Sequence, residues 1–218
     1  GIFMKKIITT VGSLLLLTIV SAKAEMGIGI SGAIHHITGD GTETTRTSNQ
    51  KNTGSHSEEA VVPEIFIEAI NDDGLAIGIS YIPTRDMGSK SRTDSNSDGD
   101  SGTYTAKAEL DNVIQIYVDT PTYSVGPAGL YAKLGIQTAT IITGESLNSG
   151  STYPDEDVFG YTAGLGFKGD LPGSMYYKLE AAYVDFENYE QSSNSSVPNK
   201  VKAELEATTA KLSIGYKF

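Results

Sequence analysis

Three histidines are the only imidazoles of this 218-residue chain, and imidazole is the first group to consider for acid–base or nucleophilic chemistry. Together with the many serines and carboxylates, they supply the residue types of a Ser/His/acid triad. Sequence alternation places His35 inward and His36 outward on one expected strand, while His56 falls in an expected loop. No nucleophile elbow, glycine-rich phosphate loop or zinc-ligand spacing accompanies them. The histidines therefore fit an interfacial or solvated role, and the sequence predicts no enzyme.

The acidic segment DSNSDGD is a second candidate site, because it matches the first half of a calcium-binding loop. Its oxygen-bearing side chains stand at alternate positions: Asp94, Asn96, Asp98 and Asp100. Thr105 occupies the twelfth position, where such loops carry a bidentate glutamate, and no helical pattern flanks the segment. A solvated polar loop is the favoured interpretation. Calcium stays open as an alternative, and no other cofactor is expected.

Composition and charge exclude several classes of protein. The chain has no cysteine, which excludes disulfides, thiolate metal sites and cysteine nucleophiles. Its formal charge of −11 and its pI near 4.6 argue against nucleic-acid binding, which needs clustered lysine and arginine. One domain accounts for this length, because all-β barrels often run this long undivided.

The amino-terminal segment has the layout of a secretory signal. Lys5 and Lys6 precede an apolar run over residues 7–20, and the small-residue motif Ala22-Lys23-Ala24 follows that run. The run is shorter than the roughly 20 residues that a membrane-spanning helix needs. We expect cleavage before Glu25. Residues 1–24 are then upstream residues plus the signal peptide, and residues 25–218 form the mature domain.

Period-two alternation dominates the mature chain, and no stretch sustains the 3.6-residue apolar repeat of a helix. In one clear case, outward Ile65 and Ile67 alternate with Glu64 and Glu68. Eight such segments follow one another, joined alternately by long polar loops and short turns. The long loops are expected at 38–57, 85–102, 144–157 and 187–199, and the short turns at 71–74, 119–129 and 169–173.

The two faces of these strands indicate a membrane barrel rather than a soluble sandwich. Many positions on one face are Gly, Ser, Ala or Thr, which suit a crowded barrel interior, while the apolar face suits lipid. Tyrosine and phenylalanine gather near strand ends, as in interfacial girdles. The sheet must close, because an open edge is costly in hydrocarbon. The expected fold is all-β, an eight-stranded antiparallel up-and-down transmembrane β-barrel.

Ten charged residues fall on the face assigned to the interior. Bases and acids are equal in number: Lys107, Lys133, Lys168, Lys178 and Lys211 against Glu64, Glu68, Glu109, Asp111 and Glu180. Because buried charges are costly unless paired, this balance favours a salt-bridged plug that fixes strand register and blocks water. A small charge-selective pore is the open alternative, although eight strands leave little room for one.

The carboxy-terminal strand carries the most specific motif, an apolar face that ends in aromatic residues: Leu212, Ile214, Tyr216 and Phe218. Val201 and Leu205, earlier in the same strand, have the opposite parity, which a bulge or a strand top beyond the membrane would explain. With this ending and the alternating segments, the chain resembles the small outer-membrane β-barrels of the OmpA/OmpX type over nearly all of 25–218. The resemblance implies export to the bacterial outer membrane. It also implies periplasmic chaperones and a barrel-assembly machinery that reads Phe218.

The sequence favours a non-enzymatic integral outer-membrane protein with four polar extracellular loops, which contributes to envelope structure or surface interaction. Its expected surroundings are outer-membrane lipid and lipopolysaccharide, with no nucleic-acid partner. A small porin-like channel is the first alternative. A lipid-modifying envelope enzyme is the second, and the sequence names no external ligand.

Overall fold

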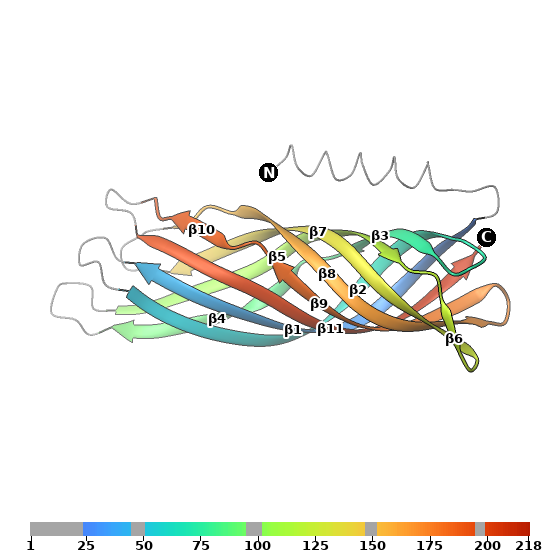
Figure 1. Ribbon diagram of the computed structural model, residues 1–218. Coiled ribbons are helices and arrows are strands. Elements are labelled where there is room, and N and C mark those ends of the chain that lie inside the picture. The colour runs from blue at the N-terminus through green and yellow to red at the C-terminus, as the bar shows by residue number, and fades with distance from the viewer. Residues whose placement is uncertain (1–23, 45–50, 95–101, 147–151, 195–198) are drawn as a thin grey trace.

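The computed structural model describes residues 24–44, 51–94, 102–146, 152–194 and 199–218 (Figure 1). The expected signal sequence before residue 24 lies outside the described residues. Within the described ranges the chain forms one sheet of eleven strands: β1 (Glu25–Thr44), β2 (Lys51–Ile70), β3 (Ala76–Ile82), β4 (Arg85–Asp94), β5 (Gly102–Asp119), β6 (Tyr123–Val125), β7 (Ala128–Ser146), β8 (Glu156–Leu171), β9 (Met175–Phe186), β10 (Tyr189–Ser192) and β11 (Lys200–Lys217). No helix in these ranges is long and apolar enough to cross a membrane.

The pairings between strands form a closed circuit. They pass from β1 through β2, β3, β5, β7, β8, β9 and β11, and β11 pairs again with β1. Beyond β3 and Pro83, β4 continues along β5, and beyond β9, β10 continues along β11. Every pairing is antiparallel, so the all-β antiparallel fold is confirmed. Figure 1 shows the strands side by side and inclined to the long axis of the molecule.

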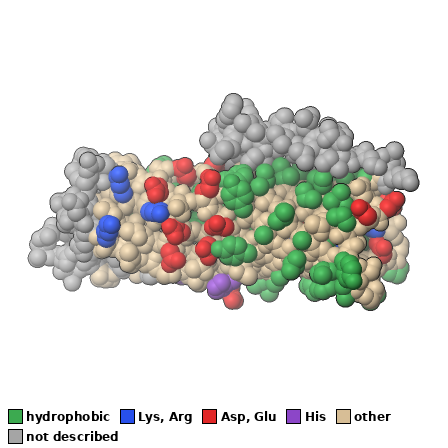
Figure 2. Space-filling model, in the orientation of Figure 1, with side chains coloured by type: hydrophobic (Ala, Val, Ile, Leu, Met, Phe, Trp, Pro, Cys, Tyr) green, Lys and Arg blue, Asp and Glu red, His purple; other side chains and the backbone are tan. Residues whose placement is uncertain are grey.

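The outward face carries an apolar belt over the half of the molecule that contains the carboxy terminus (Figures 1 and 2). Its exposed aliphatic members come from six strands: Ile28, Ile30, Ile34, Val61, Ile65, Ile67, Leu134, Leu165, Leu179, Leu212 and Ile214. Ile30 leaves 67% of its surface exposed, the opposite of a position in the core of a water-soluble protein. This apolar belt has the chemistry of a lipid-contact surface.

Above the apolar belt, at the end of the molecule away from the carboxy terminus, the strands run further than the sequence indicated. Much of the expected loop 38–57 is strand, because β1 ends at Thr44 and β2 begins at Lys51. The expected loop at 85–102 contains β4. Outward residues in this region are polar, as Figure 2 shows for the many acidic side chains beside the belt. These segments lack the outward apolar residues that identify the other strands. Their amino-acid composition is therefore that of a loop, although their backbone is paired in the sheet.

β11 crosses from one environment to the other without any change in its geometry. Its pairing with β1 runs continuously from Lys200 to Lys217, without the bulge considered above. In the upper part Leu205 is buried and Glu204 is exposed, whereas in the lower part Lys211 is buried and Leu212 is exposed. The strand top therefore lies beyond the apolar belt, which explains the opposite parity of Val201 and Leu205.

Candidate functional site

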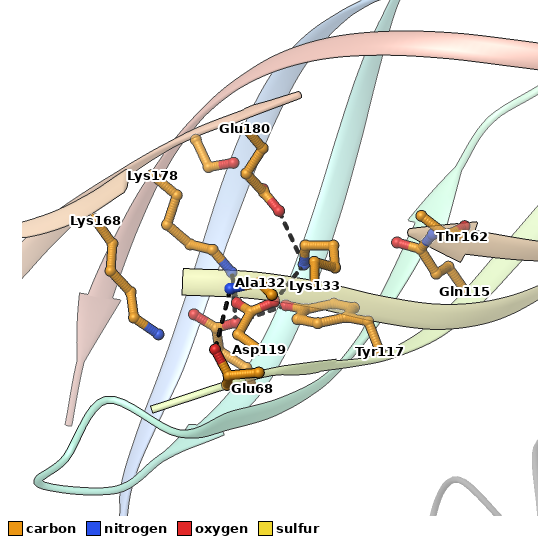
Figure 3. A network of polar contacts seen from close by, with 12 residues as sticks. Glu68, Gln115, Tyr117, Asp119, Ala132, Lys133, Thr162, Lys168, Lys178 and Glu180 are labelled. Carbon is orange, nitrogen blue, oxygen red and sulfur yellow. Dashed lines mark hydrogen bonds and ion pairs between the residues drawn. The ribbon is translucent and has the colours of Figure 1, made fainter. Parts of the chain in front are cut away.

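The interior at the level of the apolar belt holds a set of buried charges. Among the described residues, the buried acids and bases are equal in number: Glu64, Glu68, Asp119 and Glu180 against Arg85, Lys133, Lys178 and Lys211. Seven of these residues lie on β2, β5, β7, β9 and β11, where alternation turns their side chains inward, and Arg85 begins β4. Figure 3 shows members of this set converging from β2, β5, β7 and β9: Glu68, Asp119, Lys133, Lys178 and Glu180.

One half of this set is built around Asp119. Its Oδ2 lies 2.6 Å from Lys178 Nζ, and its Oδ1 lies 2.9 Å from Lys133 Nζ. Lys178 Nζ also donates to Glu68 Oε2 at 3.0 Å. Asp119 is completely buried, and an ammonium group takes the place of water as the partner of each carboxylate oxygen. Paired charges of this kind avoid the large cost of an isolated buried ion.

The other half of the buried charges continues from Lys133 through further ion pairs. Lys133 Nζ lies 3.0 Å from Glu180 Oε1, and Glu180 Oε2 lies 3.7 Å from Lys211 Nζ. Lys211 then donates to both oxygens of Glu64, at 3.0 and 3.2 Å. The contacts start at Glu68 and end at Glu64, both on β2, so they run around the interior and link β2, β9, β5, β7 and β11. We call the seven residues of this circuit the charged layer: Glu64, Glu68, Asp119, Lys133, Lys178, Glu180 and Lys211.

Buried tyrosines complete the coordination of the charged layer. Tyr117 OH and Tyr176 OH donate to the two oxygens of Glu68 at 2.7 and 2.8 Å. The Tyr117 ring also lies 3.4 Å from Lys133 Nζ, a cation–π contact. Gly78 makes room for this ring, because a Cβ there would lie 2.3 Å from Tyr117 Cζ. Small residues on the inner face thus allow large polar side chains to fill the lumen.

A second, apolar layer fills the interior above the charged layer. Its buried members come from the upper parts of the strands: Ala33, Ile37, Val62, Ile82, Leu110, Val113, Ala139, Ile141, Val158, Val184, Phe186, Tyr189, Leu205 and Ala207. We call this set the apolar layer. Between the two layers lies a cavity of about 20 Å³, room for roughly one water molecule. Among the described residues, the two layers pack the interior with side chains at both levels.

The structure does not place all ten expected interior charges together. Glu64, Glu68, Lys133, Lys178, Glu180 and Lys211 are buried in the charged layer. Lys107, Glu109 and Asp111 instead lie on the outer face, which corrects the sequence expectation. A bulge causes this difference: Asn112 has φ 50°, and the register between β5 and β7 shifts between Asp111 and Ile114. Residues before the bulge therefore face the opposite side from that given by simple alternation.

The displaced residues form surface contacts on the loop side of the apolar belt. Lys107 forms a hydrogen-bonded ion pair with Glu109 and a second ion pair with Asp86, whose Oδ1 lies 3.1 Å away. Hydrogen bonds to Glu109 and then Asp86 raise the pKa of the exposed Lys107 ammonium above its ordinary value. Thr84 hydroxyl donates to Asp111. These pairs are exposed to solvent and contribute little to the stability of the fold.

Lys168 occupies a separate position near the short turns. It is half-buried, donates to the carbonyl of Gly74, and lies with Nζ 4.7 Å from the centre of the Tyr131 ring. Within the described part of the chain, no carboxylate lies at ion-pair distance from its Nζ. Lys168 therefore borders the charged layer without closing the circuit.

Two residues of the interior were missed by sequence reasoning. The sequence pattern places Asp119 in a turn, although it shares the parity of Gln115 and Tyr117, and extending the alternation by one step would have found it. Arg85 falls in an expected loop. It is 4% exposed and its Nη1 donates to His35 Nδ1 at 3.0 Å. Arg85 follows Pro83 at the start of a new strand, and no local pattern signals its orientation.

The histidines and the acidic segment provide no metal centre within the described residues. His35 is buried, while His36 and His56 are exposed and lie 3.7 and 3.4 Å from Glu59 and Glu58. No group of three or more potential ligands gathers in the described ranges. Three of the four calcium candidates, at 96, 98 and 100, lie outside the described residues, and Asp94 ends β4.

The carboxy-terminal motif lies on the lipid-facing side. Its four side chains are all exposed: Leu212, Ile214, Tyr216 and Phe218. Phe218 also closes the last backbone pair with β1, since its N–H donates to Met26 O at 2.9 Å and its own carbonyl accepts from Met26 N–H at 3.1 Å. Phe218 therefore contributes to the pairing of β11 with β1, the first and last strands along the chain.

Comparison with known proteins finds no matching family profile and no matching curated protein. Solved structures do match. The outer membrane protein OprG from Pseudomonas aeruginosa is 15% identical with a TM-score of 0.64, over 90% of this chain and 96% of that one. AlkL is 9% identical with a TM-score of 0.51 over 90% of each chain. A major outer membrane protein from Thermus thermophilus is 8% identical with a TM-score of 0.50, over 86% of this chain and 99% of that one.

These matches define the class of the fold. The chain has the fold of the bacterial outer-membrane β-barrel proteins, as the resemblance to the OmpA/OmpX type implied. The neighbours are outer-membrane proteins, which supports the expected outer-membrane location.

Proposed function

We propose that the protein is a non-enzymatic, integral outer-membrane protein with an eight-stranded up-and-down barrel. In this interpretation β3 with β4, and β9 with β10, each form one interrupted strand, and β6 belongs to a short turn. The eight strands of the closed pairing circuit support this count. The apolar belt is the surface that contacts lipid, and the upper strands with their polar loops lie outside the cell.

The filled lumen is the single observation that carries this proposal. The charged layer spans the interior at the level of the belt, the apolar layer covers it, and the cavity between them is about 20 Å³. A barrel filled in this way suits a stable structural protein of the envelope rather than a channel for solutes. Its function then resides in what it presents, through envelope structure or surface interaction by its upper strands and loops.

The proposal is tested by gel migration and conductance of the purified protein in lipid. A closed barrel resists detergent until it is boiled, so the unboiled protein should migrate differently from the boiled one. Planar bilayers containing the protein should show no steady conductance. Identical migration before and after boiling, together with helical circular dichroism, would contradict the barrel. Regular single-channel steps would contradict the filled lumen.

A small charge-selective channel is the second candidate, and the buried charges favour it. If the charged layer were a hydrated pore lining, Glu180→Ala would change ion selectivity and leave unfolding in urea unchanged. If it is a plug, the same change leaves Lys133 and Lys211 with less compensation and lowers stability. Recording single channels and urea unfolding on the same variant separates the two functions.

The surroundings and partners of the protein follow from the same proposal. Outer-membrane lipid and lipopolysaccharide contact the apolar belt, and periplasmic chaperones and the barrel-assembly machinery act before insertion. The exposed terminal Phe218 supports a role in assembly, because it lies at the joint between β11 and β1. No cofactor is part of the proposal.

A further inference from the structure

The small cavity between the charged layer and the apolar layer is lined by both. Its walls include Lys133, Glu180, His35 and Val184. A cavity of about 20 Å³ exceeds the roughly 10–15 Å³ that one water molecule requires. Water occupies a buried cavity only where polar groups can bind it. The polar atoms of the lining residues therefore decide whether this cavity holds water.

His35 lines this cavity and carries one unsatisfied ring nitrogen among the described residues. Arg85 Nη1 lies 3.0 Å from His35 Nδ1, and a guanidinium can only donate, so Nδ1 is the acceptor. Thr209 Oγ1, 3.2 Å away, approaches the same nitrogen. The proton of the neutral ring therefore sits on Nε2. That atom is buried and has no hydrogen-bond partner among the described residues, which is costly for an N–H group.

Lys133 and Glu180 add a second donor and an acceptor. Lys133 Nζ and Glu180 Oε1 lie 3.0 Å apart as an ion pair. Lys133 Nζ also lies 2.9 Å from Asp119 Oδ1 and 3.4 Å from the Tyr117 ring, and neither Nζ nor Glu180 Oε1 has a well-aligned hydrogen bond in the described part of the chain. The cavity walls thus present two donors and one acceptor on three different residues.

We propose that the cavity is a binding site for one ordered water molecule. The water accepts from His35 Nε2–H and Lys133 Nζ–H and donates to Glu180 Oε1. A neutral ligand fits better than an ion, because the charged residues in the lining balance: Lys133 and Lys211 against Glu64 and Glu180. This inference rests on the filled lumen proposed above, and it identifies the occupant of the junction between the two layers.

The test is NMR of the histidine rings in lipid nanodiscs, with histidine labelled by 15N. Exposed His36 and His56 are changed to glutamine so that His35 is the only ring observed. We expect a single Nε2–H resonance protected from exchange, an unprotonated Nδ1, and a through-space cross-peak to a water of long residence. Fast exchange of Nε2–H with bulk water would indicate a hydrated lumen and would overturn both proposals.

Other outcomes affect only the water site. A protected Nε2–H without any water cross-peak would show a closed but dry cavity and overturn the inference. A resonance that instead moves when chloride is replaced by bromide would assign the site to an anion. A proton on Nδ1 would also overturn the inference.

A matched pair of variants tests the position of the water. Val184→Ile adds a methylene group at the cavity wall, and the water cross-peak should disappear. Val158→Ile makes the same change within the apolar layer but away from the cavity lining, and the cross-peak should remain. Persistence of the cross-peak in Val184→Ile would place the water elsewhere and contradict the assignment.

Discussion

The charged layer and the apolar layer are built on the same strands with opposite chemistry. At the level of the apolar belt, polar side chains point inward and apolar side chains point outward. Above the belt the arrangement reverses, with Leu205 and Ala207 inward on β11 and Glu204 and Glu206 outward. The strand geometry is continuous, so the change reflects the surroundings of the outer face, lipid in one region and water in the other.

On neighbouring strands the reversal occurs beside residues that pair with one another. His36 on β1 pairs with Glu59 on β2 and with Thr208 on β11, and Thr208 pairs with Tyr183 on β9. Below this level outward positions such as Ile34 and Val61 are apolar and exposed. We therefore infer that these residues lie near the upper edge of the lipid-contact surface on β1, β2, β9 and β11.

The largest effect is expected in the charged layer. Asp119→Asn removes one of two carboxylate charges near Lys133 and one near Lys178, and unpairing a buried charge typically costs about 3–5 kcal/mol. Deprotonation of a lysine or entry of water would reduce this loss but keep its sign. Urea unfolding in lipid vesicles measures it. Glu109→Gln, which alters an exposed pair, is the control, and equal stability of the two variants would contradict a structural role for the charged layer.

The next largest loss of stability is expected from a charge placed on the part of the outer face that contacts lipid. Leu179→Lys places a charge in the apolar belt, which should destabilise the barrel by about 2–4 kcal/mol. Asp185→Lys changes an exposed position on the same face of β9 above the boundary and should leave unfolding nearly unchanged. The same urea assay applies to both variants. Similar losses at the two positions would remove the distinction between lipid and water along this strand.

A smaller effect is expected from trimming the apolar layer. Ile141→Val removes one buried methylene and should cost about 0.5–1.5 kcal/mol, because the neighbouring side chains only partly close the gap. Ile34→Val, at an exposed position of the belt, leaves no such gap, because lipid fills the space. A larger loss at Ile34 than at Ile141 in urea unfolding would indicate that the apolar layer is loosely packed.

The smallest effect on stability is expected at the carboxy terminus, where the side chain touches neither layer. Deleting Phe218 removes one pair of backbone hydrogen bonds with Met26 but leaves the lumen intact. It should lower the amount of protein inserted in the outer membrane while refolding in vitro is largely retained. Quantification of the membrane fraction tests this, with the conservative replacement Phe218→Tyr as the control. Unchanged membrane levels of the deletion would contradict an assembly role.

The sequence was sufficient for the part of the fold that contacts lipid. Outward apolar residues such as Ile65 and Leu212 recur at period two, and their inward neighbours Glu64 and Lys211 are buried where alternation placed them. The upper strands are harder to recognise, because polar outward residues look like loop. Asn112 shifts the register by local backbone geometry that has no signature in hydrophobic periodicity, so alternation alone assigns Lys107 and Glu109 to the wrong face.

The position of the lipid boundary on β11 can be measured directly, because the chain contains no cysteine. Single cysteines on the outward face of β11 are spin-labelled in turn, and their accessibility to oxygen and to a water-soluble nickel complex is compared in lipid vesicles. The positions are Lys202, Glu204, Glu206, Thr208, Ala210, Leu212, Ile214 and Tyr216. A lipid boundary beside Thr208 predicts a change from nickel-accessible to oxygen-accessible labels between Thr208 and Ala210. Uniform accessibility along the whole strand would contradict it.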